Sequence, residues 1–135
     1  MPLFQWTPSC SVKVVQFDKQ HRRLFAMIND LNAAMQSGQG KVVLGNIIMA
    51  LAAYAKEHFA EEETAMRRSF YPGFVKHYEE HEEFSKRVDK FLTEYQAGNT
   101  LISIDVLRFL NSWLQDHILK SDKAYAAHLN KYGIH

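Results

Sequence analysis

The stretch HFAEEETAMRRSFYPGFVKHYEEH, from His58 to His81, determines how the rest of the chain is organised. It begins on a helical pattern, in which Leu51, Tyr54, His58 and Glu62 recur at steps of three and four residues. That spacing is the spacing of one helix face. The pattern therefore predicts a helix that carries His58 and Glu62 on the same side.

The tripeptide Tyr71-Pro72-Gly73 interrupts this pattern, because proline lacks a backbone N–H and glycine tolerates unusual dihedrals. A second helical pattern follows, with His77 and His81 one turn apart. Two antiparallel helices joined by so short a turn bring these histidines within reach of His58 and Glu62. Three imidazoles and a carboxylate on facing surfaces predict half of a metal site, with the other half supplied by the rest of the chain.

Composition and charge limit the classes of function. A chain of 135 residues fits one domain with a real core. Its net charge of +1, with no basic cluster, gives no reason to expect nucleic acid or an anionic membrane as a partner. The longest apolar run, from Ile47 to Ala55, is far shorter than the roughly 20 residues that span a bilayer.

The N-terminal sequence and the cysteine count favour a cytoplasmic protein. A signal peptide would show a basic segment followed by an apolar segment, and this N-terminal sequence lacks that pattern. Cys10 is the single cysteine, which excludes an internal disulfide and suits a reducing compartment. We expect no functional role for Cys10.

The chain divides into an N-terminal arm, residues 1–17, and a helical domain, residues 18–131. Pro2 and Pro8 argue against a helix in the arm, so we expect an extended segment whose apolar side chains lie over the domain. Asp18 is the expected N-cap of the first helix. Four helices are expected, and the first begins at Asp18 and ends before Ser37. The other three run from about Lys41 to Arg68, from Phe74 to Gln96 and, after a break at Ala97 to Thr100, from Ser103 to Lys131.

Four amphipathic helices with short connections predict an all-α protein, an up-down-up-down antiparallel four-helix bundle. In such a bundle the starts of odd helices and the later parts of even helices share one end. His21 lies near the start of the first helix and His117 lies past the middle of the fourth. We therefore expect both to meet the histidines of the central stretch in one half of the bundle, while the other half is apolar.

Burial of so many polar groups together requires an explanation. A single histidine on an apolar face is more often a hydrogen-bonded core residue than a ligand. Five imidazoles and two carboxylates in one volume cost several kcal/mol unless something pairs them, and a metal would do so. The two other histidines, His128 and His135, are expected at the surface.

Asp122 does not fit a regular helix. It follows His117 by five residues, which is roughly 140° around an ideal helix, so Ser121 should face the site in its place. Two interpretations remain open from the spacing alone. Asp122 is a solvated surface carboxylate, or the helix is locally widened by a π-type turn, a feature that occurs at functional sites.

Four segments together resemble the hemerythrin family, and in particular its single-domain bacterial members, the bacteriohemerythrins. The spacing pattern H, HxxxE, HxxxH and HxxxxD is highly specific, and the resemblance extends from Trp6 to Tyr125. The segments are FDKQH at Phe17 to His21, HFAEEE at His58 to Glu63, HYEEH at His77 to His81 and WLQDHILKSDKAY at Trp113 to Tyr125.

The resemblance implies a four-helix bundle around a non-haem di-iron centre that binds dioxygen reversibly for storage, transport or delivery to an oxygen-requiring enzyme. It implies that two irons are joined by an oxo or hydroxo group and that one coordination position stays open for dioxygen. It also favours the widened turn at Asp122. The implied ligands are His77, His81 and His117 for one iron, His21 and His58 for the other, and Glu62 and Asp122 as bridges.

Four apolar residues flank the implied ligands, and they would limit the access of water and protons to bound dioxygen. Ordinary core packing explains the same residues, and the two roles are compatible. These residues are Leu24, Phe59, Trp113 and Ile118.

Three other functions fit the sequence less well. A di-iron enzyme that consumes oxygen or peroxide would carry Glu-x-x-His on two helices, and here no histidine has a glutamate three residues before it. An oxygen or redox sensor would need a separate partner protein, since the chain leaves no room for an output domain after its fourth helix. A structural zinc site is the third possibility, but a single tetrahedral zinc ion takes four ligands and this chain offers seven. We therefore expect an oxygen-binding protein rather than an enzyme, a monomer or a weak oligomer.

Overall fold

The computed structural model describes residues 4–99 and 102–135. Pro2 and Thr100, which belong to the expected arm and the expected third break, lie outside the described residues. Within the described part of the chain the secondary structure is helical, without strands. The elements are η1 (Pro8–Cys10), α1 (Val15–Gln36), α2 (Gly40–Arg68), α3 (Phe74–Gln96), α4 (Ser103–Asp116), η2 (His117–Asp122) and α5 (Lys123–Lys131).

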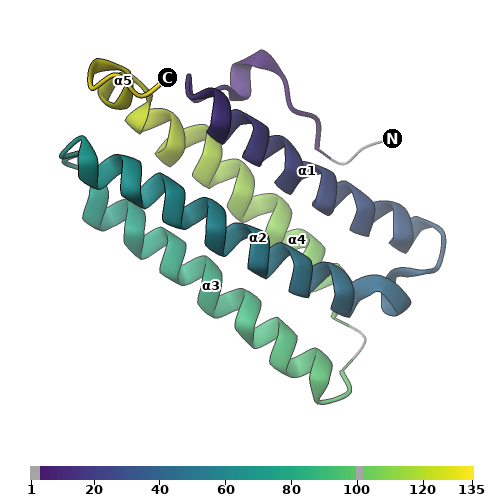
Figure 1. The fold of residues 1–135 in the computed structure, drawn as a ribbon. Coiled ribbons are helices and arrows are strands. Elements are labelled where there is room, and N and C mark those ends of the chain that lie inside the picture. The colour runs from purple at the N-terminus through teal and green to yellow at the C-terminus, as the bar shows by residue number, and fades with distance from the viewer. Residues whose placement is uncertain (1–3, 100–101) are drawn as a thin grey trace.

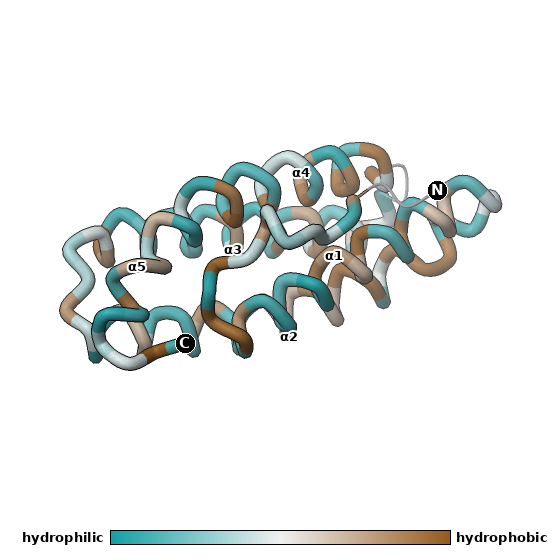
Figure 2. The backbone as a smooth tube through the Cα atoms, turned by 90° about the horizontal axis from the view of Figure 1, so that it is seen from above, coloured by the Kyte–Doolittle hydropathy of each residue, from teal (hydrophilic) through white to brown (hydrophobic). Residues whose placement is uncertain are grey.

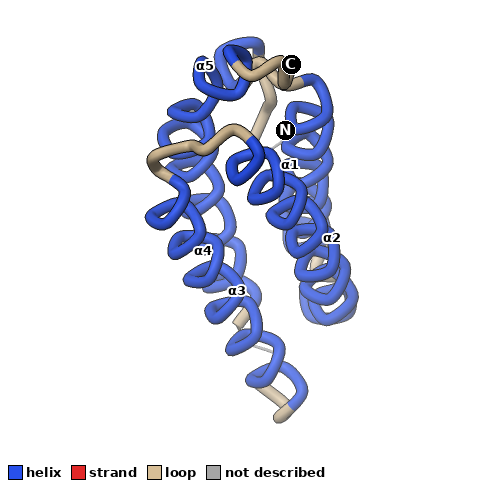
Figure 3. The backbone as a smooth tube through the Cα atoms, turned by 60° about the vertical axis from the view of Figure 1, so that its left-hand side comes forward, coloured by secondary structure: helices blue, strands red, loops and turns tan. Residues whose placement is uncertain are grey.

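The helices form the antiparallel four-helix bundle that the sequence predicts, with α4, η2 and α5 together as its fourth rod (Figure 1). α1 packs against α2, α2 against α3, and α4 contacts both α1 and α2. Along each helix apolar residues recur between polar ones (Figure 2), as the packing of amphipathic helices requires. The chain bends near η2, so that α5 lies over the end of the bundle (Figure 3).

The fourth rod is one continuous helical run from Ser103 to Lys131, but it is not a regular α-helix. Residues His117–Asp122 form a π-helix between α4 and α5. The backbone stays right-handed through the junctions, with φ −64° and ψ −50° at His117. The widened-turn interpretation of this segment is therefore confirmed, and it decides where Asp122 points.

The first helix begins earlier than expected, at Val15, and Asp18 is not its N-cap. Asp18 lies in the first turn and accepts hydrogen bonds from the Val12 N–H at 2.9 Å and the Ser11 hydroxyl at 2.6 Å. The carboxylate thus binds the end of the arm, because the arm folds back beside the helix and leaves two donors within its reach. The N-cap expectation was wrong.

The described part of the arm lies along the bundle and contains one helical turn, η1 at Pro8–Cys10. Phe4 is buried against the ring of Phe25, at 3.9 Å between ring centroids. Near its end the arm is tied to α5, where Lys123 donates to the Ser9 carbonyl at 2.6 Å and Asn130 donates to the Lys13 carbonyl at 2.9 Å. The arm therefore connects the first and last helices at one end of the bundle.

The turn between α2 and α3 is as short as expected, but its left-handed residue is Phe70, with φ 57°, rather than the glycine. The Tyr71 N–H bonds the Met66 carbonyl at 2.9 Å, which closes the end of α2. Gly73 has an ordinary φ of −85°. Its small size matters instead, since a Cβ there would lie 2.8 Å from the Tyr71 ring.

Two hydrophobic clusters fill the bundle. The larger one occupies the half beyond the central histidines and includes Leu24, Phe59, Phe84 and Ile118. A smaller one closes the opposite end, and we call it the end cluster; its buried members are Val12, Val14, Phe17, Ala65, Met66, Tyr125 and Leu129. No helix among the described residues is both long enough and apolar enough to cross a membrane.

Candidate metal centre

Seven polar side chains meet between the two hydrophobic clusters. Along α1 His21 lies between Phe17 of the end cluster and Leu24 of the larger cluster, and along α2 Glu62 lies between Ala65 and Phe59. All seven are buried, none with more than 3% of its surface exposed. The helices thus supply His21 from α1, His58 and Glu62 from α2, His77 and His81 from α3, and His117 and Asp122 from η2.

The seven side chains form two overlapping groups of possible metal ligands. One group contains His77, His81 and His117, the other contains His21 and His58, and both contain the two carboxylates. Within each group the candidate ligand atoms lie within 4.8 Å of one another. Two carboxylates shared by a group of three imidazoles and a group of two suit two neighbouring ions.

Asp122 lies at the centre of this arrangement. Its Oδ1 is 2.9 Å from Nε2 of both His77 and His117, and its Oδ2 is 3.0 Å from Nε2 of His21. One carboxylate therefore reaches imidazoles of both groups, one oxygen to each. The π-helix makes this possible, because on a regular α-helix the side chain five residues after His117 would point elsewhere.

Glu62 reaches across the same boundary from the other side. Its Oε1 lies 3.2 Å from Nε2 of His58 and 3.4 Å from Nε2 of His81, while its Oε2 lies 3.5 Å from Nε2 of His21. Oε2 also accepts a 2.5 Å hydrogen bond from the Tyr125 hydroxyl. Tyr125 is completely buried, so the end cluster holds this carboxylate in place.

The donor set fits metal ions better than it fits a purely organic network. The buried atoms that face the centre lie 2.9–3.5 Å from one another, yet five of them make no well-directed hydrogen bond among the described residues, namely Nε2 of His21 and His77, Oε1 of Glu62 and both carboxylate oxygens of Asp122. Nε2 of His81 and Nε2 of His117 are 3.1 Å apart. Unpaired buried atoms of this kind are costly. Imidazole and carboxylate ligands suit iron, among other transition metals.

Outer hydrogen bonds fix the orientation of three imidazoles. Nδ1 of His58 lies 2.5 Å from Oε1 of Gln20, and Nδ1 of His81 lies 2.9 Å from a carboxylate oxygen of Glu63. Nδ1 of His117 lies 2.9 Å from Oε1 of Glu80. An Nδ1–H that donates outward directs Nε2 at the centre, and Nε2 would bind a metal once it has lost its own proton, in the tautomer that a metal requires.

These outer partners were missed by the sequence analysis. Gln20, Glu63 and Glu80 each stand directly beside a predicted ligand in the sequence but bind a histidine of another helix. The signal that could reveal them is adjacency, since a residue one position from an inward side chain points about 100° away, toward a neighbouring helix. Tyr125 follows Asp122 by three residues, which is the spacing of one helix face.

Strong electrostatic coupling holds the centre together without a metal. Burial opposes ionisation of Glu62, but the charge of His58 and the close contacts of the surrounding imidazoles hold the pKa of Glu62 well below its usual range. Burial and the negative charge of Glu62 oppose ionisation of Asp122, but His117 and His21 lower the pKa of Asp122 below its usual range. Burial opposes protonation of the histidines, but the two carboxylates raise the pKa of His21 to about 9 and that of His117 to about 10.

The charged groups of the centre also shift the pKa values of two residues at its edge, Glu80 and Tyr125. The hydrogen bond from His117 lowers the pKa of Glu80 to about 2, despite some opposition from burial, so Glu80 is ionised at neutral pH. Burial raises the pKa of Tyr125 well above its usual range, and the charges of Glu62 and Asp122 add to the effect. Tyr125 therefore keeps its proton and donates it to Glu62 as a hydrogen bond.

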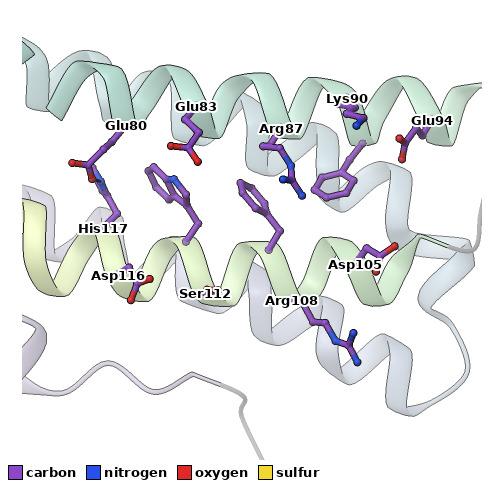
Figure 4. A pocket seen from close by; sticks show the side chains of 13 residues that line it. Glu80, Glu83, Arg87, Lys90, Glu94, Asp105, Arg108, Ser112, Asp116 and His117 are labelled. Carbon is purple, nitrogen blue, oxygen red and sulfur yellow. Dashed lines mark hydrogen bonds and ion pairs between the residues drawn. The ribbon is translucent and has the colours of Figure 1, made fainter. Parts of the chain in front are cut away.

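Apolar and aromatic side chains surround the centre on the side of the larger cluster. The Phe59 ring stacks on His81, at 3.8 Å and 9°, and the Trp113 ring stacks on His117, at 4.4 Å and 16°. Leu24 and Ile118 are buried members of the same cluster. Trp113 is half-buried, and it reaches the surface in a groove of about 670 Å³ between α3 and α4. Figure 4 shows this groove, with Glu80 and His117 at one end.

The other two histidines lie outside the centre. His135 is exposed, as expected. His128 is half-buried rather than a free surface residue, because its Nε2 lies 2.6 Å from the Ser69 carbonyl and its ring lies between Tyr71 and Tyr132.

Comparisons with known proteins agree with this geometry. Residues 12–129 match the family model described as the hemerythrin HHE cation binding domain. A bacteriohemerythrin of Stenotrophomonas maltophilia is 37% identical over 98% of this chain and 88% of its own, and one of Methylococcus capsulatus is 33% identical over 93% and 95%. A crystal structure of wild-type hemerythrin superimposes with a TM-score of 0.86 at 32% identity, covering 94% of this chain and 98% of that one.

The pKa shifts predict how the stability of the metal-free protein depends on pH. The stabilisation from protonated His21 and His117 is complete below about pH 6.5 and is lost as the pH rises through about 9 and 10. The stabilisation from ionised Glu62 and Asp122 is complete above about pH 4.5 and is lost at lower pH, as the pH falls through their depressed values. The free energy of unfolding, measured by denaturant titration after removal of metal, should therefore be highest between about pH 4.5 and 6.5 and should fall toward pH 10.

His21→Gln should make that decline between pH 6.5 and pH 10 shallower, because one of the two imidazoles is gone. In the metal-loaded protein the trend should reverse near neutral pH, since metal binding requires unprotonated imidazoles. A metal-free protein equally stable at pH 6 and pH 10 would contradict this electrostatic description.

Proposed function

The chain belongs to the hemerythrin family, and on that premise we propose that it binds dioxygen reversibly at a non-haem di-iron centre formed by the seven clustered side chains. The observation that carries the proposal is the division of these side chains into a group of three imidazoles and a group of two that share both carboxylates. When bound, a pair of irons supplies the electrons and the coordination position that reversible dioxygen binding requires.

The proposed ligand set assigns His77, His81 and His117 to one iron, and His21 and His58 to the other. Glu62 and Asp122 would bridge the two ions, together with an oxo or hydroxo group. In support, each carboxylate directs its oxygens at imidazoles of both groups. The group with two imidazoles contributes one fewer protein atom, so the iron held by His21 and His58 would be the one with a position left for dioxygen.

The residues around the centre are proposed to make the binding reversible. Leu24, Phe59, Trp113 and Ile118 offer apolar or aromatic surface and no acidic proton, so they would keep water and protons from bound dioxygen. The acidic and amide groups nearby are directed at the outer nitrogens of imidazoles instead. The chain thus stabilises the ligands, while the four wall residues add no acidic group to the pocket.

We propose a carrier or store of dioxygen rather than an enzyme, in the cytoplasm, as a monomer or weak oligomer that serves a separate oxygen-accepting enzyme. Five imidazoles with two carboxylates favour the ferrous state more than the carboxylate-rich centres of ferritin-like enzymes do. A signalling role through a separate partner, or oxidation with peroxide, is the alternative. The family relationship favours the carrier.

The oxygen response of the reduced protein tests the proposed function. Protein loaded with ferrous iron under nitrogen should develop charge-transfer absorption in the near-ultraviolet and visible range when oxygen is added. The bands should disappear when oxygen is removed by argon, over repeated cycles. A reduced protein with two irons per chain whose spectrum ignores oxygen would refute the proposal and favour a structural site.

The bridging carboxylates are tested by metal content. Asp122→Ala or Glu62→Ala should reduce the iron content well below two per chain, because each variant removes a ligand of both ions. Asp116→Ala is the matched control, since this carboxylate lies six residues before Asp122, at the end of α4, with its side chain 71% exposed. Two irons per chain in the Asp122→Ala variant would exclude Asp122 as a bridge.

The pocket wall is tested by the lifetime of the oxygenated protein. Trp113→Ala should leave iron loading intact but should speed the conversion to the ferric form several-fold, because it opens the surface groove toward His117. Trp6→Ala is the control, because this indole also packs on the larger cluster but lies over Arg22 rather than on a histidine, and it should leave the rate unaltered. Equal rates for Trp113→Ala and the unmodified protein would remove Trp113 from the wall.

A further inference from the structure

Glu80 contacts the π-helical segment at two positions at once. Its Oε1 accepts a hydrogen bond from Nδ1 of His117 at 2.9 Å and another from the Ser121 hydroxyl at 2.6 Å. His117 is the first residue of η2 and Ser121 is the fifth, whereas Glu80 belongs to α3. Figure 4 shows Glu80 reaching from α3 to His117 across the groove.

The register of η2 decides whether Asp122 takes part in the centre. In a regular α-helix the residue four positions after His117 lies on nearly the same face, roughly 40° away, and the residue five positions after lies roughly 140° away. Ser121 would then face the centre and Asp122 would not. In the π-helix Asp122 is fully buried at the centre and Ser121 contacts α3.

A π-turn is rare and does not persist without compensating interactions. The contact between Ser121 and Glu80 exists in the π register and conflicts with the α register, in which the hydroxyl would turn toward the centre. The contact between Glu80 and His117 holds the other end of the segment to the same atom. Oε1 of Glu80 can therefore accept both hydrogen bonds only when the segment has the length of the widened turn.

We propose that Glu80 is a positioning residue that fixes the π register of residues 117–122 by bridging His117 and Ser121, and so directs Asp122 at the centre. The inference about the register rests on the contacts alone. Its consequence for metal binding rests also on the proposed function, because it takes Asp122 to be a bridging ligand. Glu80 itself binds no metal in this account.

The chain offers a matched control in Glu63. Its carboxylate contacts Nδ1 of His81 at 2.9 Å, which is the distance between Glu80 and His117. The two carboxylates are similarly sheltered, with 16% and 26% of the side chain exposed. Glu63 differs in that its hydrogen bond joins α2 to α3 and does not involve η2. A general effect of a carboxylate on an imidazole ligand should therefore appear in both, and a register effect only in Glu80.

Hydrogen exchange in the metal-free protein tests the register directly. Glu80→Ala and Ser121→Ala should each raise the exchange rates of the backbone amides of η2 by about tenfold or more, while amides in the middle of α1 and α2 keep their rates. Glu63→Ala should leave the η2 amides unchanged. Glu80→Gln should also leave them nearly unchanged, because its amide oxygen can still accept both hydrogen bonds.

Cobalt(II) titration of the same variants tests the consequence for the centre. Glu80→Ala should weaken the binding of the second ion by about tenfold or more, the scale expected for the loss of a partner of a ligand. Ser121→Ala should do so in the unmodified chain but should have less than about a twofold effect in the Glu80→Ala chain, because the two residues act through one contact. Ser121→Ala and Glu63→Ala should combine independently.

The outcomes separate this inference from the proposed function. Unchanged exchange of the η2 amides in both Glu80→Ala and Ser121→Ala, or an equal increase in Glu63→Ala, would overturn the role of Glu80, whatever the metal content. Failure of the unmodified protein to bind two metal ions would overturn the proposed function and leave the exchange result valid. If Glu80→Ala does not fold, as judged by circular dichroism, Ser121→Ala, Glu80→Gln and Glu63→Ala decide the question.

Discussion

The structure depends on the burial of two carboxylates, Glu62 and Asp122, in the interior of a small bundle. Neither is accessible to solvent, and an isolated ionised carboxylate in such a place would be very unfavourable. Five imidazoles surround the pair, and the contacts are close enough to keep both carboxylates ionised even without a metal. Each of the four rods must therefore hold its one or two histidines beside the carboxylates, and this requirement governs helix order, loop length and register.

The fourth rod meets the requirement by departing from the α-helix. Regular geometry would bring His117 to the centre and turn Asp122 away from it. The π-helix from His117 to Asp122 resolves the conflict, and it lies where the end cluster, the centre and α3 meet. Irregular geometry at this point is thus a condition for assembling the centre, rather than a fault in the helix.

The helical spacing of the sequence predicts the bundle and the level of the histidines, because both follow from periodicity and short connections. It cannot decide between the two positions of Asp122, since the energy of a π-turn depends on the contacts of Ser121 with Glu80 and of Tyr125 with Glu62, whose partners are distant in sequence; the family resemblance favours the right one. The N-cap expectation at Asp18 failed because the arm supplied better partners, the Val12 N–H and the Ser11 hydroxyl. The positive φ at Phe70 was equally hidden, since the local sequence favours Gly73, three residues later, as the left-handed residue.

The end cluster has a consequence for how ions would enter and leave. It separates the centre from solvent at the end of the bundle, and the arm fastens it by the hydrogen bonds of Lys123 to Ser9 and Asn130 to Lys13. An ion that departs by this end must wait until α5 and the arm come apart together. Along this route the rate of metal loss is set by how often α5 separates from the arm. A stronger chelator in solution therefore would not remove the metal faster by this end.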